Sequence, residues 1–176
     1  KNKNKNKKQK TQGTFSNLSS LLTSFNVAKE QANDLIFFVE DDYLHHENML
    51  IEVVKTYERI SSQLNSDIFV CPADYPFLYV NNEKTNVLIG NSRHWRTINK
   101  TLCTFFTSKK LINKYWDNFE KNCIDRHDPF EKYLNEIYEK EICISPLKSL
   151  SIHMTNVNSS YGLSPFVDYK KIWDEN

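Results

Sequence analysis

Three consecutive carboxylates, Glu40, Asp41 and Asp42, directly follow an unbroken apolar run over residues 35–39. The run is rich in β-branched and aromatic residues and is too short for an ordinary helix, so it predicts a strand buried on both faces. Because side chains alternate along a strand, Glu40 and Asp42 should leave on one side and Asp41 on the other. Two acids are therefore expected together at the carboxyl end of the strand, where open α/β sheets bind ligands.

Acids placed side by side need a counter-charge. Adjacent carboxylates repel one another, and burial without a cationic partner costs several kcal/mol for each ion. A hard divalent cation, Mn²⁺ or Mg²⁺, fits these residues because one or two carboxylates can bind it while water and substrate phosphates complete its coordination. The alternative is a polar strand end whose exposed acids bind nothing. The abrupt change from apolar residues to three acids favours the metal interpretation.

Composition indicates one globular domain preceded by a basic tail. The chain has 176 residues, of which 39% are hydrophobic and 26% charged, and this length is sufficient for a sizeable core. Residues 1–13 are rich in Lys and Asn, and their low complexity predicts a disordered tail before a domain over residues 14–176. Without the six lysines of the first ten residues, 17 basic residues face 22 acidic ones, so nucleic acid is not an expected partner.

The sequence carries no pattern of export or membrane insertion. No apolar stretch is long enough to span a bilayer and no signal-peptide pattern is present, so the chain is expected to be soluble and cytoplasmic, without a transmembrane segment. The four cysteines include no Cys-x-x-Cys pair, which predicts reduced and buried thiols.

Hydrophobic spacing predicts an alternation of helices and strands. Helices are expected over residues 14–29, after His46, after Ser108 and from residues 128–131 onward. Short apolar runs predict strands over residues 35–39, 67–71, 87–89, 102–107 and 142–144, with a loop over 72–86 and an irregular segment over 151–174. The opening order of helix, strand, helix and strand is typical of parallel βαβ units. The expected fold class is therefore α/β, with a mixed, mainly parallel sheet flanked by helices.

His94, Trp95 and Arg96 bring a titratable ring, a large stacking surface and a fixed cation to consecutive positions. Arginine suits bidentate phosphate contacts, and the charge of Arg96 could balance the acids at residues 40–42. The alternative places Trp95 in the core and Arg96 on the surface. Both interpretations stay open, because a Trp–Arg pair is also an ordinary cation–π arrangement.

Asp128 is a candidate general base, because a carboxylate at the start of a helix could take a proton from an attacking hydroxyl. The sequence Asp128-Pro-Phe-Glu131 is also a good helix start, with an acid at the N-cap, proline at the first helical position and glutamate at the third. Capping is the stronger prediction from these residues alone, although the two roles are compatible.

Three histidines are candidate metal ligands. His45 and His46 adjoin the acids, but their adjacency makes joint ligation of one ion awkward. His153 lies near an expected strand end, and a lone histidine is more often structural or exposed than a ligand.

Several of these segments resemble motifs of GT-A-type glycosyltransferases related to family 2. The segments are Val39-Glu-Asp-Asp-Tyr-Leu-His45, His94-Trp-Arg-Thr-Ile-Asn99 leading into Thr101-Leu-Cys-Thr-Phe105, and Leu163-Ser-Pro-Phe-Val-Asp168. Their order and spacing are similar to those of the family, over about residues 14–168. The resemblance implies a GT-A-like, Rossmann-type fold. Because only residues 1–33 precede the acidic strand, it also implies that the first nucleotide-binding strands are absent and that the domain is partial.

The resemblance implies transfer of a sugar from a nucleoside diphosphate sugar to the hydroxyl of a glycan or another acceptor, with Mn²⁺ or Mg²⁺ and with inversion. Glu40 or Asp41 is expected to face the nucleotide ribose, and Asp42 to bind the metal. His153 sits where a late histidine of the family can complete the metal site.

By the same resemblance, Asp128 sits where family members place the general base, and residues 94–96 are expected at the nucleotide sugar. Two other functions stay open. One is a non-catalytic sugar- or partner-binding module derived from the same fold. The other is a metal-dependent phosphohydrolase, in which the carboxylates hold ions that activate water.

Overall fold

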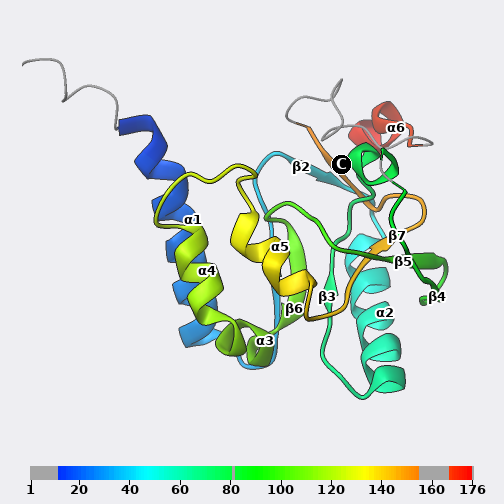
Figure 1. Cartoon of the computed structure of the whole chain (residues 1–176). Coiled ribbons are helices and arrows are strands. Elements are labelled where there is room, and N and C mark those ends of the chain that lie inside the picture. The colour runs from blue at the N-terminus through cyan, green and yellow to red at the C-terminus, as the bar shows by residue number, and fades with distance from the viewer. Residues whose placement is uncertain (1–11, 81, 155–166, 176) are drawn as a thin grey trace, which may run out of the picture.

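The computed structural model describes residues 12–80, 82–154 and 167–175, with side chains from residue 17 onward (Figure 1). The helices are α1 (Gln12–Gln31), α2 (Met49–Leu64), the 3₁₀ helix η1 (Pro76–Tyr79), α3 (Lys109–Lys114), α4 (Trp116–Asn122), α5 (Lys132–Tyr138) and α6 (Tyr169–Glu175). The strands are β1 (Leu35–Phe38), β2 (Tyr43–His45), β3 (Phe69–Val70), β4 (Val87–Ile89), β5 (His94–Ile98), β6 (Phe105–Ser108), β7 (Cys143–Pro146) and β8 (Ser151–His153). Most of the tail over residues 1–13, and residues 163–166 of the last motif, lie outside the described residues.

Six strands form one sheet in the order β1-β6-β3-β7-β5-β4. Only β3 and β7 are parallel, and the other neighbouring strands are antiparallel. The expectation of a mainly parallel sheet is therefore wrong, whereas a mixed sheet flanked by helices is confirmed. The reason lies in β6, which inserts between β1 and β3. Because both of these strands are antiparallel to β6, they run in the same direction without pairing with each other.

The inner strands β3, β6 and β7 are buried on both faces of the sheet, whereas the edge strand β4 is largely exposed. Phe69 and Phe105 pack on one side with α1, α3, α4 and α5, while Val70 and Phe106, the next residues along, pack on the other side with α2. This alternation is the two-residue period of a strand. Figure 1 shows the resulting layers, with α1, α3, α4 and α5 together on one side and α2 on the other.

Helix boundaries differ from the prediction at two places. The helix expected after Ser108 is split into α3 and α4 at Tyr115, although Ser108 does cap α3 by accepting a hydrogen bond from the Leu111 amide at 3.2 Å. The helix expected from residue 128 begins later, because the N-cap of α5 is Glu131. The prediction that Asp128 caps this helix is therefore wrong.

Other segments contain more regular structure than the sequence predicted. Residues 94–98, expected only as a connection, form β5, which pairs with both β4 and β7. The segment expected to be irregular after residue 151 contains β8 and α6. In the part of the chain that the structure describes, no helix is long and apolar enough to cross a membrane.

Candidate functional site

The site expected from the sequence lies where β1 ends and the chain turns into β2. β2 pairs with β8 in a separate two-stranded antiparallel sheet, with Tyr43 opposite His153. The Met154 amide extends this ladder by donating to the Asp42 carbonyl at 2.7 Å. As a result, the Asp42 carboxylate and the His153 ring meet, with Oδ2 and Nε2 2.9 Å apart. The Asp42 side chain keeps 33% of its surface exposed, so solvent and small ligands can reach it.

Glu40 lies half-buried beside this pair. The Thr104 hydroxyl accepts a hydrogen bond from the Glu40 amide at 3.0 Å and donates to its Oε2 at 3.4 Å. Burial, and then the negative charge of Asp42, raise the pKa of the Glu40 carboxyl to about 7. Asp41 is exposed. The expected arrangement, with Glu40 and Asp42 near each other, therefore agrees with the electrostatic coupling between these two acids.

Glu40 and Asp42 form an acid cluster, and two tyrosines and the His153 ring lie beside it. The hydroxyl groups of Tyr43 and Tyr75 are hydrogen-bonded to each other, and Tyr75 is buried in the core. The Tyr43 ring centroid lies 5.0 Å from that of His153. Burial and the nearby Glu40 charge raise the pKa of Tyr43 above its ordinary value, so the hydroxyl stays protonated in its hydrogen bond with Tyr75.

Glu131 is an acid of this region that the sequence reasoning missed as a functional residue. It lies at the N-cap of α5, half-buried, and its charge acts on Glu40. Burial raises the pKa of the Glu131 carboxyl to about 7. The sequence does contain a signal for the partial burial of Glu131. By helical spacing, Glu131 shares a face with Leu134 and Tyr138, three and seven positions later, and both of these residues are buried. Asp128, the base expected from the resemblance, is exposed.

The segment over residues 94–96 does not join the acid cluster. Trp95 is 0% exposed and its indole N–H donates to Glu52 Oε1 at 3.3 Å, so the ring is a core residue with no face open to a ligand. Arg96 is also buried, and its Nη2 lies 2.7 Å from Asp74 Oδ1. Its charge is therefore balanced by Asp74 and not by residues 40–42. His94 is exposed at the start of β5.

The two adjacent histidines have separate environments. The His45 Nδ1 lies 2.7 Å from the Ser151 hydroxyl, across the pair formed by β2 and β8. Burial lowers the pKa of His45, and burial together with the charge of Arg93 lowers that of His46. Both rings are therefore neutral at pH 7.

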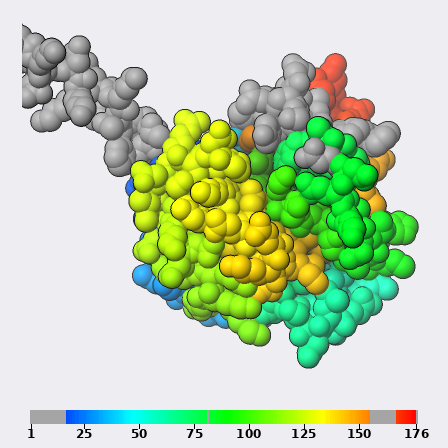
Figure 2. Space-filling model, in the orientation of Figure 1, coloured from blue at the N-terminus to red at the C-terminus, as the bar shows by residue number. Residues whose placement is uncertain are grey.

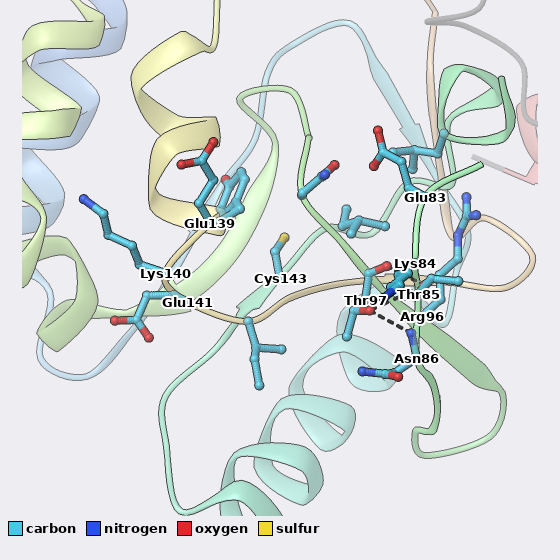
Figure 3. Close-up of a pocket in the computed structure, with 15 residues that line it drawn as sticks. Glu83, Lys84, Thr85, Asn86, Arg96, Thr97, Glu139, Lys140, Glu141 and Cys143 are labelled. Carbon is cyan, nitrogen blue, oxygen red and sulfur yellow. Dashed lines mark hydrogen bonds between the residues drawn. The ribbon is translucent and has the colours of Figure 1, made fainter. Parts of the chain in front are cut away.

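A hollow lies beside the C-terminal end of α5, away from Asp42 and His153. Figure 2 shows a recess between the yellow to orange surface around α5 and the green surface around η1 and β4. The hollow has a volume of about 360 Å³ and an apolar floor that includes Leu78, Ile98 and Ile142. Figure 3 shows Glu139, Lys140 and Glu141 on one side and the segment from Glu83 to Asn86 on the other. Two of its acids are paired with lysines, Glu83 with Lys100 and Glu141 with Lys114.

The donor set at Asp42 and His153 fits a divalent cation, because one carboxylate and one imidazole nitrogen face each other at a half-buried position that solvent can reach. Within the described ranges, no group of three or more His, Cys, Asp or Glu side chains is placed to hold a metal ion. A cation bound here could take further ligands from a substrate and from water. Comparison of the chain with models of protein families, with characterised proteins and with solved structures gave no match.

Proposed function

We propose that this chain is a GT-A-type glycosyltransferase domain related to family 2. It transfers a sugar from a nucleoside diphosphate sugar to an acceptor hydroxyl, with Mn²⁺ or Mg²⁺ and with inversion. One observation carries the proposal: Asp42 and His153, far apart in the sequence, lie 2.9 Å apart at the carboxyl end of β1. These are the two residues to which the resemblance, which rests on sequence motifs alone, gives the role of metal ligands.

The neighbouring groups support a site that handles a negatively charged substrate. Asp42 and His153 would hold the cation, and Glu40 and Asp41 lie on the same short segment, where the nucleotide ribose is expected. The cation, when bound, supplies positive charge that neutralises the departing diphosphate. The raised pKa of Glu40, to about 7, reduces the negative charge that a diphosphate meets on approach at neutral pH.

The acceptor hydroxyl needs a group that takes its proton as its oxygen attacks the anomeric carbon. The resemblance gives this role to Asp128, whose exposed carboxylate lies in the loop before α5. Asp128 would take the proton, while a cation held by Asp42 and His153 would balance the charge of the diphosphate.

The test is thermal unfolding with UDP, GDP and dTDP, each with and without Mn²⁺. A ligand at 100 times its Kd adds about 2.7 kcal/mol to the free energy of unfolding, which raises the midpoint of a domain of this size by roughly 5–10 °C. We expect a metal-dependent rise with one nucleotide, and Asp42→Asn should abolish it. Asp34→Asn, an exposed acid at the other end of β1, is the matched control and should keep the rise.

The outcomes separate the candidate functions. A metal-dependent rise followed by release of nucleoside diphosphate in the presence of an acceptor supports the transferase. A rise without any release favours the sugar- or partner-binding module, and metal-dependent hydrolysis of phosphoesters favours the phosphohydrolase. An equal rise in wild type and Asp42→Asn would contradict the metal assignment.

A further inference from the structure

We propose that Tyr43 is a positioning residue: its ring holds the imidazole of His153 towards Asp42, and Tyr75 in turn holds the Tyr43 ring. The inference rests on the proposed function, which makes Asp42 and His153 the metal ligands. It assigns roles to two tyrosines that the resemblance leaves without one, and the contacts that carry it are present before any cation binds.

The pairing of β2 with β8 brings the two rings together. Tyr43 lies directly opposite His153. The Met154 amide donates to the Asp42 carbonyl at 2.7 Å, so the adjacent pair is hydrogen-bonded, and the pair of Tyr43 and His153 is by alternation a non-hydrogen-bonded pair of the ladder. Side chains approach each other most closely at such pairs, and both point to the same face of the two strands. The backbone thus places the tyrosine beside the histidine.

The Tyr43 ring limits the orientations that the His153 ring can take. The ring centroids are 5.0 Å apart, with the planes inclined by 36°. In this orientation the imidazole Nε2 lies 2.9 Å from Asp42 Oδ2, and only 14% of the His153 side chain is exposed. A side chain that is already held in its binding orientation has less rotamer entropy to lose when a ligand binds. Tyr43 therefore favours cation binding through His153.

Tyr43 itself is tied to the core through its hydroxyl group. The side chain is half-buried, and its hydroxyl is hydrogen-bonded to the hydroxyl of Tyr75. Tyr75 is 1% exposed, and its ring stacks on that of Phe77 with the centroids 5.2 Å apart. The support thus runs from the core through Tyr75 and Tyr43 to His153. Groups that orient a metal ligand contribute to the affinity for the metal.

The experiment compares variants of the two tyrosines in the full chain. Tyr43→Leu removes the ring, whereas Tyr43→Phe, Tyr75→Phe and the double variant keep both rings and remove the hydroxyl bond. The readout is the Mn²⁺ concentration that gives half of the rise in unfolding midpoint, with UDP, GDP and dTDP tested in turn. We expect this concentration to increase by about 10–100-fold in Tyr43→Leu, as for the loss of a group that orients a metal ligand.

Loss of the hydroxyl bond should have a smaller effect that depends on both tyrosines. Each single phenylalanine variant should raise the half-saturating Mn²⁺ concentration by about 2–10-fold. The double variant should raise it by the same factor, because each of the three variants lacks the same bond. Effects that multiply in the double variant would mean that the tyrosines act independently, and they would contradict the link through Tyr75.

Tyr57 provides the matched control. It is a buried tyrosine of α2 that packs on the other side of the six-stranded sheet from Tyr75, and its hydroxyl donates to Asp67 Oδ1 at 3.0 Å. Tyr57→Phe should lower the unfolding midpoint of the ligand-free protein. It should change the half-saturating Mn²⁺ concentration by less than about twofold, because it packs in the other half of the core. A Tyr43 with only a structural role would behave in the same way, and that result would overturn the proposal.

The ligand-free protein gives a readout that does not depend on the proposed function. The ring protons of His153 lie close to the Tyr43 ring, so their NMR chemical shifts report the packing of the two rings. We expect these shifts to change in Tyr43→Leu and in Tyr75→Phe and to stay unchanged in Tyr57→Phe.

The outcomes separate the role of Tyr43 from the proposed function. Unchanged His153 shifts in Tyr75→Phe, or an unchanged half-saturating Mn²⁺ concentration in Tyr43→Leu, would overturn the role of Tyr43 alone. Absence of any Mn²⁺-dependent rise in the wild type would overturn the proposed function and the metal role of His153, and the NMR comparison would still decide whether Tyr43 holds the ring.

Discussion

Glu52 is a buried acid whose partners decide its protonation state. It is 2% exposed on α2, and its two carboxylate oxygens accept hydrogen bonds from the Ser92 amide and hydroxyl, the Asn91 amide group, Trp95 and Thr56. Burial raises the pKa of Glu52, but these hydrogen bonds outweigh it and lower the pKa to about 2. The network therefore joins α2 to the turn that leads into β5, and it requires an ionised carboxylate.

Glu52→Gln should lower the free energy of unfolding by roughly 2–3 kcal/mol at pH 7, because an amide cannot accept from every one of these donors. A depressed pKa stabilises the fold above the unfolded value of 4.5, and this contribution is lost as the pH falls from 4.5 towards 2. The difference between wild type and variant should therefore shrink between pH 5 and pH 3. Urea unfolding at both pH values measures it, with the exposed Glu58→Gln as the control. A difference that stays constant with pH would contradict the ionised network.

Single residues set the limit of what the sequence could predict about the site. The acids at residues 40–42 were found from the change of residue type after an apolar run, which is local information. The approach of His153 to Asp42 came only from the resemblance, because no periodicity relates positions that a chain brings together by folding. For Trp95, the sequence left a ligand-binding role and a core position open. An aromatic ring suits both equally well, and only its packing decides between them.

Helices and strands were predicted well where one apolar helix face or one apolar run of residues defines them. The strand after residue 34, α2 and β4 appear where hydrophobic spacing placed them. The order of strands in the sheet was not predictable in the same way. Continuous apolar strands are typical of parallel sheets covered on both faces, but here helices cover both faces of a mostly antiparallel sheet, so the insertion of β6 between β1 and β3 leaves no local signal. The short strands β2 and β8 escaped detection because three residues carry little periodicity.

The cap of α3 provides a test of local structure. Ser108→Ala removes the hydroxyl that accepts from the Leu111 amide, and it should cost about 1 kcal/mol of the free energy of unfolding. Ser62→Ala, at an exposed position inside α2, removes a serine hydroxyl that caps nothing and should change the free energy by less than about 0.5 kcal/mol. Chemical denaturation of both variants gives the comparison, and equal effects would mean that the cap contributes nothing measurable.

At the scale of the whole molecule, the raised pKa of Glu131 predicts how stability depends on pH. A carboxyl whose folded pKa is about 7 stabilises the fold below its unfolded value of 4.5, and this contribution is lost as the pH rises through 7. Glu131→Gln cannot ionise, so it escapes this loss. We expect both proteins to be similarly stable at pH 4, and the variant to be more stable by about 1–2 kcal/mol at pH 8, after allowing for partial exposure.

This comparison also isolates one group among several. The lowered pKa values of His45 and His46 change stability with pH as well, but they do so equally in both proteins. Thermal unfolding across this pH range measures the difference, and Asp128→Asn is the control, which should follow the wild type. A variant that tracks the wild type at every pH would mean that Glu131 is ordinarily solvated.

The contact between Asp42 and His153 joins positions 111 residues apart, through a ladder of three residue pairs in a sheet of its own. The six-stranded sheet already closes most of this loop, because β7 ends at Pro146 and β8 begins at Ser151. Burial holds β8 in place together with the ladder, since Ser151 and Ile152 are each 1% exposed. Under the proposed function, His153 is therefore held by the core of the domain, and the two protein ligands are in place before a substrate arrives.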